Sequence, residues 1–330
     1  MGNKFVTFIE QGNGTAHVGA RLSEPTKSPF GYFGAKQRLA LYIAKTLPPH
    51  NAWVEAFCGS AAVTMAKKPA EIEIVNDADS QIVNVFRQLR QHSAKLIRLV
   101  ELTPYARSEF EDAYRTTTKK SKLEQARRFL VASMMTVNGA IGSNGNGVRH
   151  SGFSYSQAYS RNGQEARVHR WNSLPDRLQA VVQRLKHVRV ERRDARELLE
   201  MFMNRPATLV YLDPPYLMDR SHGYKIDANE KTFHEELLEL CVRAKCMILM
   251  SGYSNPLYSS YLAKDDGWKQ VSIKTHTRDT KGKDLARTEI LWMNRYFTKA
   301  SARGRVPIRL SAPEKANHKI NPVRGRKSSE

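Results

Sequence analysis

Short apolar runs alternate with amphipathic stretches along most of the chain, a pattern typical of strands that alternate with helices. Apolar runs that predict buried strands occupy residues 52–57, 72–75, 188–190, 208–212, 246–250, 270–275 and 288–294. Stretches that predict helices occupy residues 37–47, 174–185 and 232–244, and residues 80–135 are expected to be mainly helical. This order predicts an α/β fold with a mostly parallel sheet.

The first strand runs into a tight turn at Gly59, and the next strand ends at Asp77, 18 residues later. Glycine lets the backbone turn sharply and approach a ligand, and an acid at the end of the second strand can hold ribose hydroxyls. Positions 61 and 62 are alanines, so the phosphate-binding glycine fingerprint of dinucleotide sites is missing. An adenosyl ligand without phosphates and a turn without any ligand both fit these residues.

The sharpest chemical motif is Asp213-Pro214-Pro215-Tyr216, at the end of an apolar strand. Two consecutive prolines stiffen the turn and remove backbone donors. The Asp213 carboxylate and the Pro214 carbonyl would then accept both hydrogens of an exocyclic amine, while Tyr216 offers an aromatic face to a flipped base. The motif therefore predicts a site for the amino group of a nucleobase.

Charge indicates the class of partner. The chain holds 53 Lys and Arg against 32 Asp and Glu, a net charge of +21, and its isoelectric point is near 10.0. Such a field concentrates polyanions, so nucleic acid is expected. Residues 299–330 predict a disordered basic tail, and residues 137–163, rich in Gly, Asn and Ser, predict a functional loop. The candidate residues for contacts to the nucleic acid are Asn144, Arg149, Tyr155 and Arg161.

Other classes of protein are disfavoured. No apolar stretch approaches about 18 residues, so no membrane span is expected. The first residues lack the apolar core of a signal peptide, which favours the cytoplasm. The three cysteines and ten histidines show no ligand spacing, so no metal is expected.

Together the motifs resemble the Dam-like, or D12, class of adenine-N6 DNA methyltransferases. The resemblance covers about residues 29–297. The segments that carry it are residues 32–36 (YFGAK), 55–60 (EAFCGS), 76–77 (ND), 193–194 (RD), 213–216 (DPPY) and 287–294 (RTEILWMN). The chain departs from the family at Ala56, where proline is more frequent, and at Ala61, where glycine is more frequent.

The resemblance implies a Rossmann-like methyltransferase fold that passes the methyl of S-adenosylmethionine directly to N6 of a flipped adenine in double-stranded DNA. It implies catalytic roles for Asp213, Pro214, Pro215 and Tyr216. The residues it implies for cofactor binding are Tyr32, Lys36, Phe57, Gly59, Asp77, Asp194 and Asp213. The expected divisions are a leader (1–28), two parts of the core (29–99 and 188–298), a mainly helical target-recognition insertion between them (100–187), and the tail (299–330).

Two other functions remain open on the sequence. The order of the motifs favours adenine, but the tetrapeptide alone does not exclude an N4-cytosine DNA methyltransferase or an RNA base methyltransferase. A non-catalytic DNA-binding protein on this fold is the other alternative, although Asp77, Asp213 and Tyr216 are intact. Methylation of cytosine at C5 is disfavoured, because it needs a cysteine nucleophile, usually after proline, and no cysteine here follows a proline. The protein is expected to be a monomer.

Overall fold

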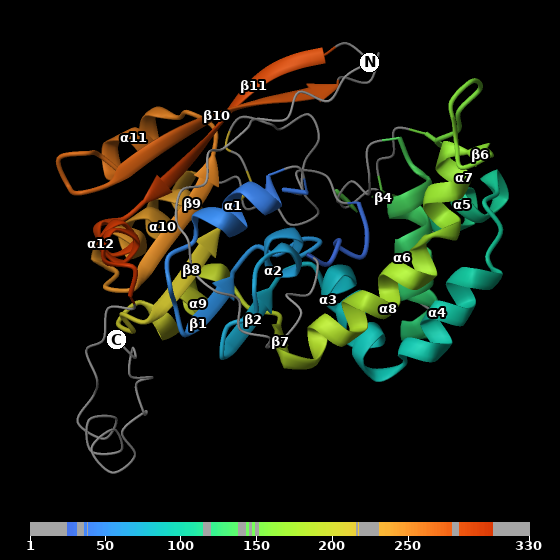
Figure 1. The fold of residues 1–330 in the computed structure, drawn as a ribbon, viewed down its shortest axis with the longest axis horizontal. Helices are drawn as coiled ribbons and strands as arrows, with labels where there is room; N and C mark the ends of the chain where they lie inside the picture. Colours follow the sequence, from blue (N-terminus) through green and yellow to red (C-terminus); the bar gives the residue numbers. More distant parts are fainter. Residues whose placement is uncertain are drawn as a thin grey trace, which may run out of the picture.

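The computed structural model describes a sheet covered by helices together with a group of further helices beside it (Figure 1). The described residues are 25–31, 36–37, 39–114, 120–137, 143–144, 147–148, 152–215, 217, 231–278 and 284–305. Among these, side chains are not described at residues 143–144, 147–148, 275–278 and 284–287.

Seven strands form the sheet, in the order β10-β11-β9-β8-β1-β2-β7. They are β1 (Ala52–Glu55), β2 (Ile72–Asn76), β7 (Val188–Glu191), β8 (Thr208–Leu212), β9 (Met247–Gly252), β10 (Lys269–Arg278) and β11 (Asp284–Met293). The five strands from β7 to β9 in this order are parallel, whereas β11 is antiparallel to both β9 and β10. The expected α/β fold with a mostly parallel sheet is confirmed.

The strand order reverses beside β1. The chain continues from β1 to β2 on one side, and β8 later pairs with the other side of β1. The register aligns Glu55 with Val75 of β2 and with Tyr211 of β8, so the carboxyl ends of these three strands lie together. In open α/β sheets, ligands bind outside the carboxyl ends of the strands at such a reversal.

Alternate residues of the strands pack against helices on opposite faces of the sheet. Trp53 and Tyr211 face a cluster that includes side chains of α1 (Ala40–Thr46), α2 (Ala62–Ala66) and α12 (Arg295–Arg303). Val54 and Val210 face the opposite cluster, formed with α9 (Ala195–Phe202), α10 (Lys231–Arg243) and α11 (Pro256–Tyr261). The apolar content of both faces explains why the central strands are continuous apolar runs.

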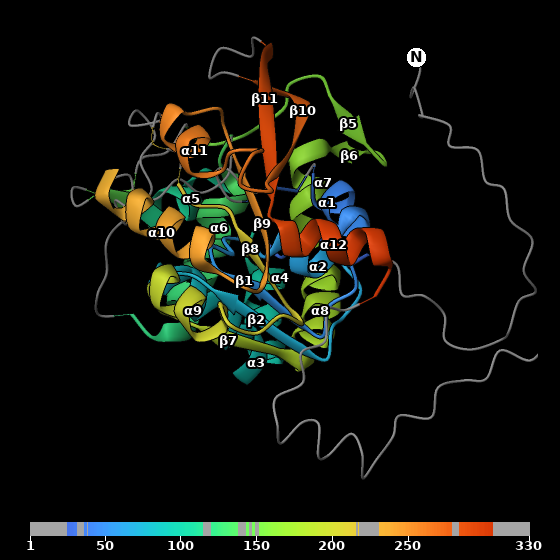
Figure 2. The same ribbon diagram turned by 90° about the vertical axis from the view of Figure 1, so that its left-hand side faces the viewer.

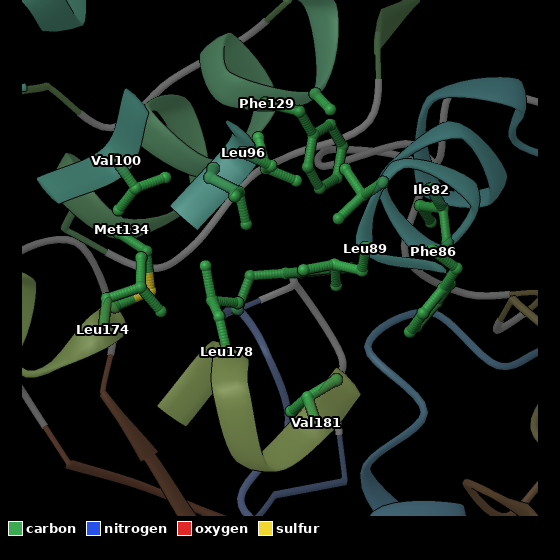
Figure 3. Packing of buried hydrophobic residues seen from close by; sticks show 14 of the residues in the cluster. Ile82, Phe86, Leu89, Leu96, Val100, Phe129, Met134, Leu174, Leu178 and Val181 are labelled. Carbon is green, nitrogen blue, oxygen red and sulfur yellow. The ribbon is translucent and has the colours of Figure 1, made fainter. Parts of the chain in front are cut away.

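The helical part lies beside β2 and β7. It consists of α3 (Ser80–Gln91), α4 (Ser93–Leu102), α5 (Arg107–Tyr114), α6 (Lys122–Met135), α7 (Ala166–Asn172), α8 (Leu174–Arg184) and the 3₁₀ turn η1 (Leu185–His187). Side chains of α3, α4, α6 and α8 point toward one another in its core (Figure 3). The described part of residues 100–187, where the mainly helical insertion is expected, contains helices and short strands, and position 100 itself lies inside α4.

Two hairpins project on the same side of the molecule. One is formed by β10 and β11, and the other by β5 (Ser160–Arg161) and β6 (Gln164–Glu165), directly before α7. Both lie at the top of the molecule in the two views (Figures 1 and 2). The remaining pair, β3 (Ser143–Asn144) and β4 (Gly147–Val148), falls within the loop predicted at residues 137–163.

The start predicted for the basic tail, residue 299, is too early. Helix α12 continues to Arg303, because Ala300 is buried against the sheet and Gly304 ends the helix in the left-handed conformation. Residues 306–330 lie outside the described residues, as do residues 1–24 of the expected leader. Within the described chain, no helix is both long and apolar enough to span a membrane.

Candidate active site

Asp213 follows the last residue of β8 and is held by two side chains from other elements. The Lys36 ammonium donates to both carboxylate oxygens, with Nζ 2.6 Å from Oδ1 and 2.8 Å from Oδ2. The Ser251 hydroxyl, on β9, donates to Oδ1 at 2.8 Å. Oδ1 therefore has two donors and Oδ2 has one, which fixes the carboxylate and leaves Oδ2 the better placed to accept from a further group.

Lys36 is buried between two carboxylates. Its second partner is Glu289 of β11, whose Oε1 lies 3.4 Å from Nζ, and both residues are buried. Burial alone would lower the pKa of Lys36, but the charges of Asp213 and Glu289 outweigh it, so the pKa lies above its ordinary value. Lys36 is therefore a permanent cation at neutral pH and cannot serve as a base.

A directed chain of hydrogen bonds leads to Asp213 from the core. The Tyr211 hydroxyl lies 2.9 Å from Ser251 Oγ. Since the single Ser251 hydrogen goes to the Asp213 carboxylate, which can only accept, the Tyr211 hydroxyl must donate to Ser251. Tyr211 is fully buried and stacks on Trp53 at 5.9 Å between ring centroids. A rigid core thus positions the Asp213 carboxylate through Ser251.

The turn after β1 meets the acid after β2. The Gly59 N–H donates to Asp77 Oδ2 at 2.8 Å, and the Asp79 N–H donates to Asp77 Oδ1 at 2.9 Å. Burial raises the pKa of Asp77 to about 6, against these hydrogen bonds. Gly59 adopts φ of 48°, in the left-handed region that favours glycine, and both residues remain half-buried rather than enclosed.

The turn contains a second left-handed residue, which is not glycine. Ala61 has φ of 53° and ψ of 38° where it precedes α2, and it is fully buried. A residue with a Cβ atom is strained in this conformation. The preference for glycine implied by the family resemblance at this position therefore has a backbone cause.

Asp194 lies at the end of β7 and caps α9. Its Oδ1 accepts from the Arg196 N–H at 2.8 Å, and its Oδ2 pairs with the Arg196 guanidinium at 2.5 Å, which lowers the pKa of Asp194. The same guanidinium lies 4.7 Å from the ring centroid of Phe233, which contacts Phe57 edge-on. Both Asp194 oxygens are thus already engaged, and a ligand would have to use the remaining lone pairs.

Asn76 ties three strand ends together. Its side-chain amide donates to the Ala56 carbonyl at 2.9 Å and to the Arg193 carbonyl at 3.1 Å, and its Oδ1 accepts from the Arg193 N–H at 2.8 Å. The ends of β1, β2 and β7 are therefore held at fixed spacing, with Phe57, Gly59, Asp77 and Asp194 directly after them.

Several of the predicted residues can be described only in part or not at all. Tyr32, Arg149 and Tyr216 lie outside the described residues, and Asn144 is placed in β3 without a described side chain. Pro214 and Pro215 are buried after β8. Tyr155 is exposed and Arg161 is exposed on β5. The structure thus brings together Lys36 with Asp213, and Gly59 with Asp77.

The site also contains buried polar residues that were not expected from the sequence. Ser251 and Glu289 contact Asp213 and Lys36 directly, and Glu289 lies inside the segment 287–294 that carries the family resemblance. Glu55, at the end of β1, accepts from the Thr64 N–H at 3.0 Å and from its hydroxyl, and burial raises its pKa to about 7. Only Glu55 carried a local signal, as an acid near the end of a predicted strand, whereas the contacts of Ser251 and Glu289 depend on packing between distant elements.

Comparison with known families identifies the chain. Residues 32–277 match the model of the D12 class N6 adenine-specific DNA methyltransferase family. No curated protein matches the sequence significantly. Among solved structures, a protein of Pyrococcus horikoshii described as an RNA methyltransferase is 8% identical, with 79% of this chain and 82% of that chain covered and a TM-score of 0.36. Precorrin-6y C5,15-methyltransferase of Geobacter metallireducens is 7% identical, with 78% of this chain and 85% of that chain covered and a TM-score of 0.33. A SAM-dependent methyltransferase of Agrobacterium tumefaciens is 12% identical, with 80% of this chain and 63% of that chain covered and a TM-score of 0.36. These TM-scores are too low to support a conclusion about this chain. The class of protein is therefore established by the strand order and the family match.

The fold is the Rossmann-like fold of S-adenosylmethionine-dependent methyltransferases, with the acids after its strand ends in the positions where such sheets bind ligands. The chain belongs to the D12 class N6 adenine-specific DNA methyltransferase family. Its methyl donor is S-adenosylmethionine. Among the described residues, no group of three or more His, Cys, Asp or Glu could hold a metal ion.

The residues after β1 and β2 fit an adenosyl ligand. Asp77 is a half-buried carboxylate with a raised pKa, and its partners in the described chain are backbone N–H groups that leave lone pairs on both oxygens. Two ribose hydroxyls are donors of the kind that such a carboxylate accepts. Gly59, without a side chain, leaves room beside it for the ligand.

Proposed function

We propose that this protein methylates N6 of adenine in DNA, with Asp213 as the residue that contacts the target amine. The observation that carries the proposal is the contact of Asp213 with Lys36 and Ser251, at 2.6 and 2.8 Å from its Oδ1. The family match supports adenine in DNA as the target, and the net charge of +21 supports a polyanionic substrate.

The fixed carboxylate suits an amine that is a poor nucleophile. The lone pair of an exocyclic amine is delocalised into the ring, and acceptors for its two hydrogens concentrate electron density on the nitrogen. Asp213 Oδ2 would accept one hydrogen and the Pro214 carbonyl the other. A carboxylate held by Lys36 and Ser251 needs little reorganisation when positive charge develops on the amine.

As the bond from N6 to the methyl carbon forms and the sulfonium–carbon bond breaks, the proton that N6 loses would pass to the Asp213 carboxylate or to water, not to Lys36. That side chain is already protonated, and the two neighbouring carboxylates raise its pKa further. We infer that Lys36 orients Asp213 and balances its charge. Tyr216 and Tyr32 would lie against the target base and the cofactor, as the family resemblance implies.

The cofactor would be held by residues that follow β1, β2 and β7. S-adenosylmethionine supplies an electrophilic methyl group on its sulfonium. Asp77 would accept from the ribose hydroxyls, Gly59 would allow close approach of the backbone, and Phe57 would contact the adenosyl group, with Asp194 beside its adenine. Their common position beside the reversal of strand order supports these roles.

Target recognition would fall to the helical part and the loop at residues 137–163. Tyr155 and Arg161 are exposed there, and the β5–β6 hairpin that carries Arg161 projects on the same side as the β10–β11 hairpin (Figure 2). Asn144 and Arg149 belong to the same proposed surface. DNA bound between the two hairpins would be double-stranded, with the target base turned out of the stack.

Nucleoside analysis tests the proposal directly. DNA and RNA are incubated with the protein and S-adenosylmethionine, digested, and separated by mass spectrometry, with an Asp213→Asn variant as the control. We expect N6-methyl-2′-deoxyadenosine from DNA with the natural protein only. N4-methyl-2′-deoxycytidine, a methylated ribonucleoside, or the absence of any product would each contradict the proposal, the last of them indicating a binding protein without activity.

A further inference from the structure

Three arginines on α7 and the start of α8 are half-buried without an acidic partner in the part of the chain that the structure describes. They are Arg167, Arg170 and Arg177. The four other half-buried arginines of the described chain all pair with carboxylates: Arg127 and Arg128 with Glu124, Arg184 with Glu73, and Arg196 with Asp194. Among the described residues, arginines at this depth are thus paired with carboxylates outside this cluster and unpaired within it.

The contacts of the cluster are made with uncharged atoms. Arg177 Nη2 lies 3.4 Å from the Arg170 carbonyl oxygen, and Arg170 Nη2 lies 3.7 Å from the sulfur of Met134. Burial lowers the pKa of both arginines, to about 10 for Arg177, and a neighbouring guanidinium adds to the effect in each case. A guanidinium has five N–H donors, so most donors of the cluster remain available for a ligand.

The nearby acid Glu165 does not pair with the guanidinium groups of the cluster. Glu165 lies close to Tyr105, which is a neighbour of Arg167 and Arg170. Both Glu165 oxygens accept from the backbone N–H groups of Arg167 and Val168 at the start of α7. The cluster therefore has an excess of positive charge that an external anion would balance.

We propose that Arg167, Arg170 and Arg177 form a binding site for backbone phosphates of the DNA substrate. This inference rests on the proposed function and adds to it the place where the helical part holds the duplex. A planar guanidinium matches two phosphate oxygens, and the hydrogen bonds are charge-assisted. Because the three groups are already partly removed from water, an arriving phosphate gains more from them than from exposed arginines.

The packing around the cluster keeps the site rigid. Leu174 and Leu178 lie on either side of Arg177 in α8 and are fully buried close to Met134 (Figure 3). The cluster follows the β5–β6 hairpin directly in the chain, and that hairpin projects on the same side as β10 and β11 (Figure 1). A duplex whose backbone is bound by the cluster would lie next to the exposed Arg161.

The test is the salt dependence of DNA binding by variants of the full-length protein. Arg170→Met, Arg177→Met and the double variant are compared with the natural protein on one short DNA duplex. Removal of one arginine–phosphate pair should reduce the slope of log affinity against log salt by about 0.9. The matched control is Arg98→Met, an exposed arginine on α4 of the same helical part, where Arg98 pairs with Glu101 and the slope should not change.

Two further measurements separate a weaker phosphate site from a damaged fold. The melting temperature of the free Met variants should equal or exceed that of the natural protein, because an uncompensated buried charge has been removed. Arg177→Lys keeps the charge and removes the bidentate geometry, so it should weaken binding while the salt slope stays near that of the natural protein. Affinity for S-adenosylmethionine should be the same in all variants.

The outcomes distinguish this inference from the proposed function. If the natural protein neither binds nor methylates DNA, the proposed function is wrong. If the natural protein does both, and the double Met variant keeps the full salt slope and the full affinity, the phosphate site is wrong while the proposed function stands. A double variant that binds DNA normally but has reduced affinity for S-adenosylmethionine would also overturn the phosphate site.

Discussion

Lys36 and Asp213 lie 177 positions apart in the chain, yet the Lys36 ammonium reaches both oxygens of the Asp213 carboxylate, at 2.6 and 2.8 Å. The contact joins the segment before α1 to the end of β8, across the centre of the sheet. Glu289 of β11 lies on the other side of the same ammonium at 3.4 Å. Three elements thus meet at one buried cation.

Replacement of Lys36 should destabilise the fold as well as the site. Lys36→Met leaves the half-buried Asp213 and the buried Glu289 carboxylates without their cation, and breaking a buried ion pair costs about 3–5 kcal/mol. The free energy of unfolding from urea titration checks this. Glu289→Gln is the matched control, because it retains the pair of Lys36 with Asp213 and should cost less. A Lys36→Met variant as stable as the natural protein would contradict the described network.

Ser251→Ala should impair turnover more than binding. The change removes one donor from Asp213 and the acceptor of the Tyr211 hydroxyl, so the carboxylate is no longer held in a fixed orientation. A hydrogen bond to a charged group is worth about 1.5–3 kcal/mol, which corresponds to a roughly 10- to 150-fold lower single-turnover rate if it is missing in the transition state.

The control for that variant is Ser260→Ala, an exposed serine on α11 whose hydroxyl donates to the Leu257 carbonyl. It should leave the transfer rate unchanged. Affinities of Ser251→Ala for S-adenosylmethionine and for DNA should also match those of the natural protein. An unchanged transfer rate in Ser251→Ala would show that Asp213 needs no support from Ser251.

Binding of S-adenosylmethionine should weaken as the pH falls below about 6. Burial raises the pKa of Asp77 in the free protein to about 6, so its protonated fraction grows as the pH falls through this value, and the charged acceptor for the ribose hydroxyls disappears. If only the carboxylate form binds, affinity falls about tenfold per pH unit well below the pKa.

Asp77→Ala provides the comparison. It should reduce the affinity at neutral pH about 10- to 150-fold and abolish the dependence on pH near 6. Titration calorimetry over the range measures both effects. An affinity that is independent of pH in the natural protein, or unchanged in the variant, would remove Asp77 from the cofactor site.

Removal of residues 306–330 should weaken binding to all DNA sequences alike. This segment has six Lys and Arg against two Glu and few aromatic side chains, so it is expected to contact phosphates without reading bases. The salt slope should become shallower, while the methylated sequence stays the same. A truncation at residue 298 would be the wrong experiment, because it deletes Ala300 and most of α12 from the core. A changed recognition sequence would contradict the prediction.

The central strands were predictable because each is a short apolar run with turn residues at its ends, whereas β10 and β11 are longer than the segments 270–275 and 288–294 that the sequence indicates. β1, β2, β8 and β9 lie within two residues of the positions that the sequence indicates. Helix α9 was not predicted, although Ala195, Leu198 and Leu199 recur at helical spacing and are buried. Helix α12 was also not predicted, since its basic residues resemble those of the tail and only the burial of Phe297 and Ala300 shows that the chain packs on the sheet there.

The sequence predicted which residues belong to the candidate site better than it predicted the contacts between them. Motif spacing placed Asp77 and Asp213 after strand ends, which the topology then brings to one edge of the sheet. The partners of Asp213 depend on packing between distant elements, so neither Ser251 nor Glu289 could be recognised from local sequence. The left-handed backbone at Ala61 was equally hidden, because only a dihedral angle shows the strain.

The central claim is that Asp213 contacts the amine during methyl transfer, and a single-turnover measurement tests it most directly. The natural protein and Asp213→Asn are each saturated with S-adenosylmethionine and substrate DNA, and the rate of N6-methyladenine formation is followed. Affinities for cofactor and DNA and the melting temperature serve as controls for folding. We predict that the variant binds both ligands and forms no measurable product. Transfer by Asp213→Asn at a rate close to that of the natural protein would contradict the claim.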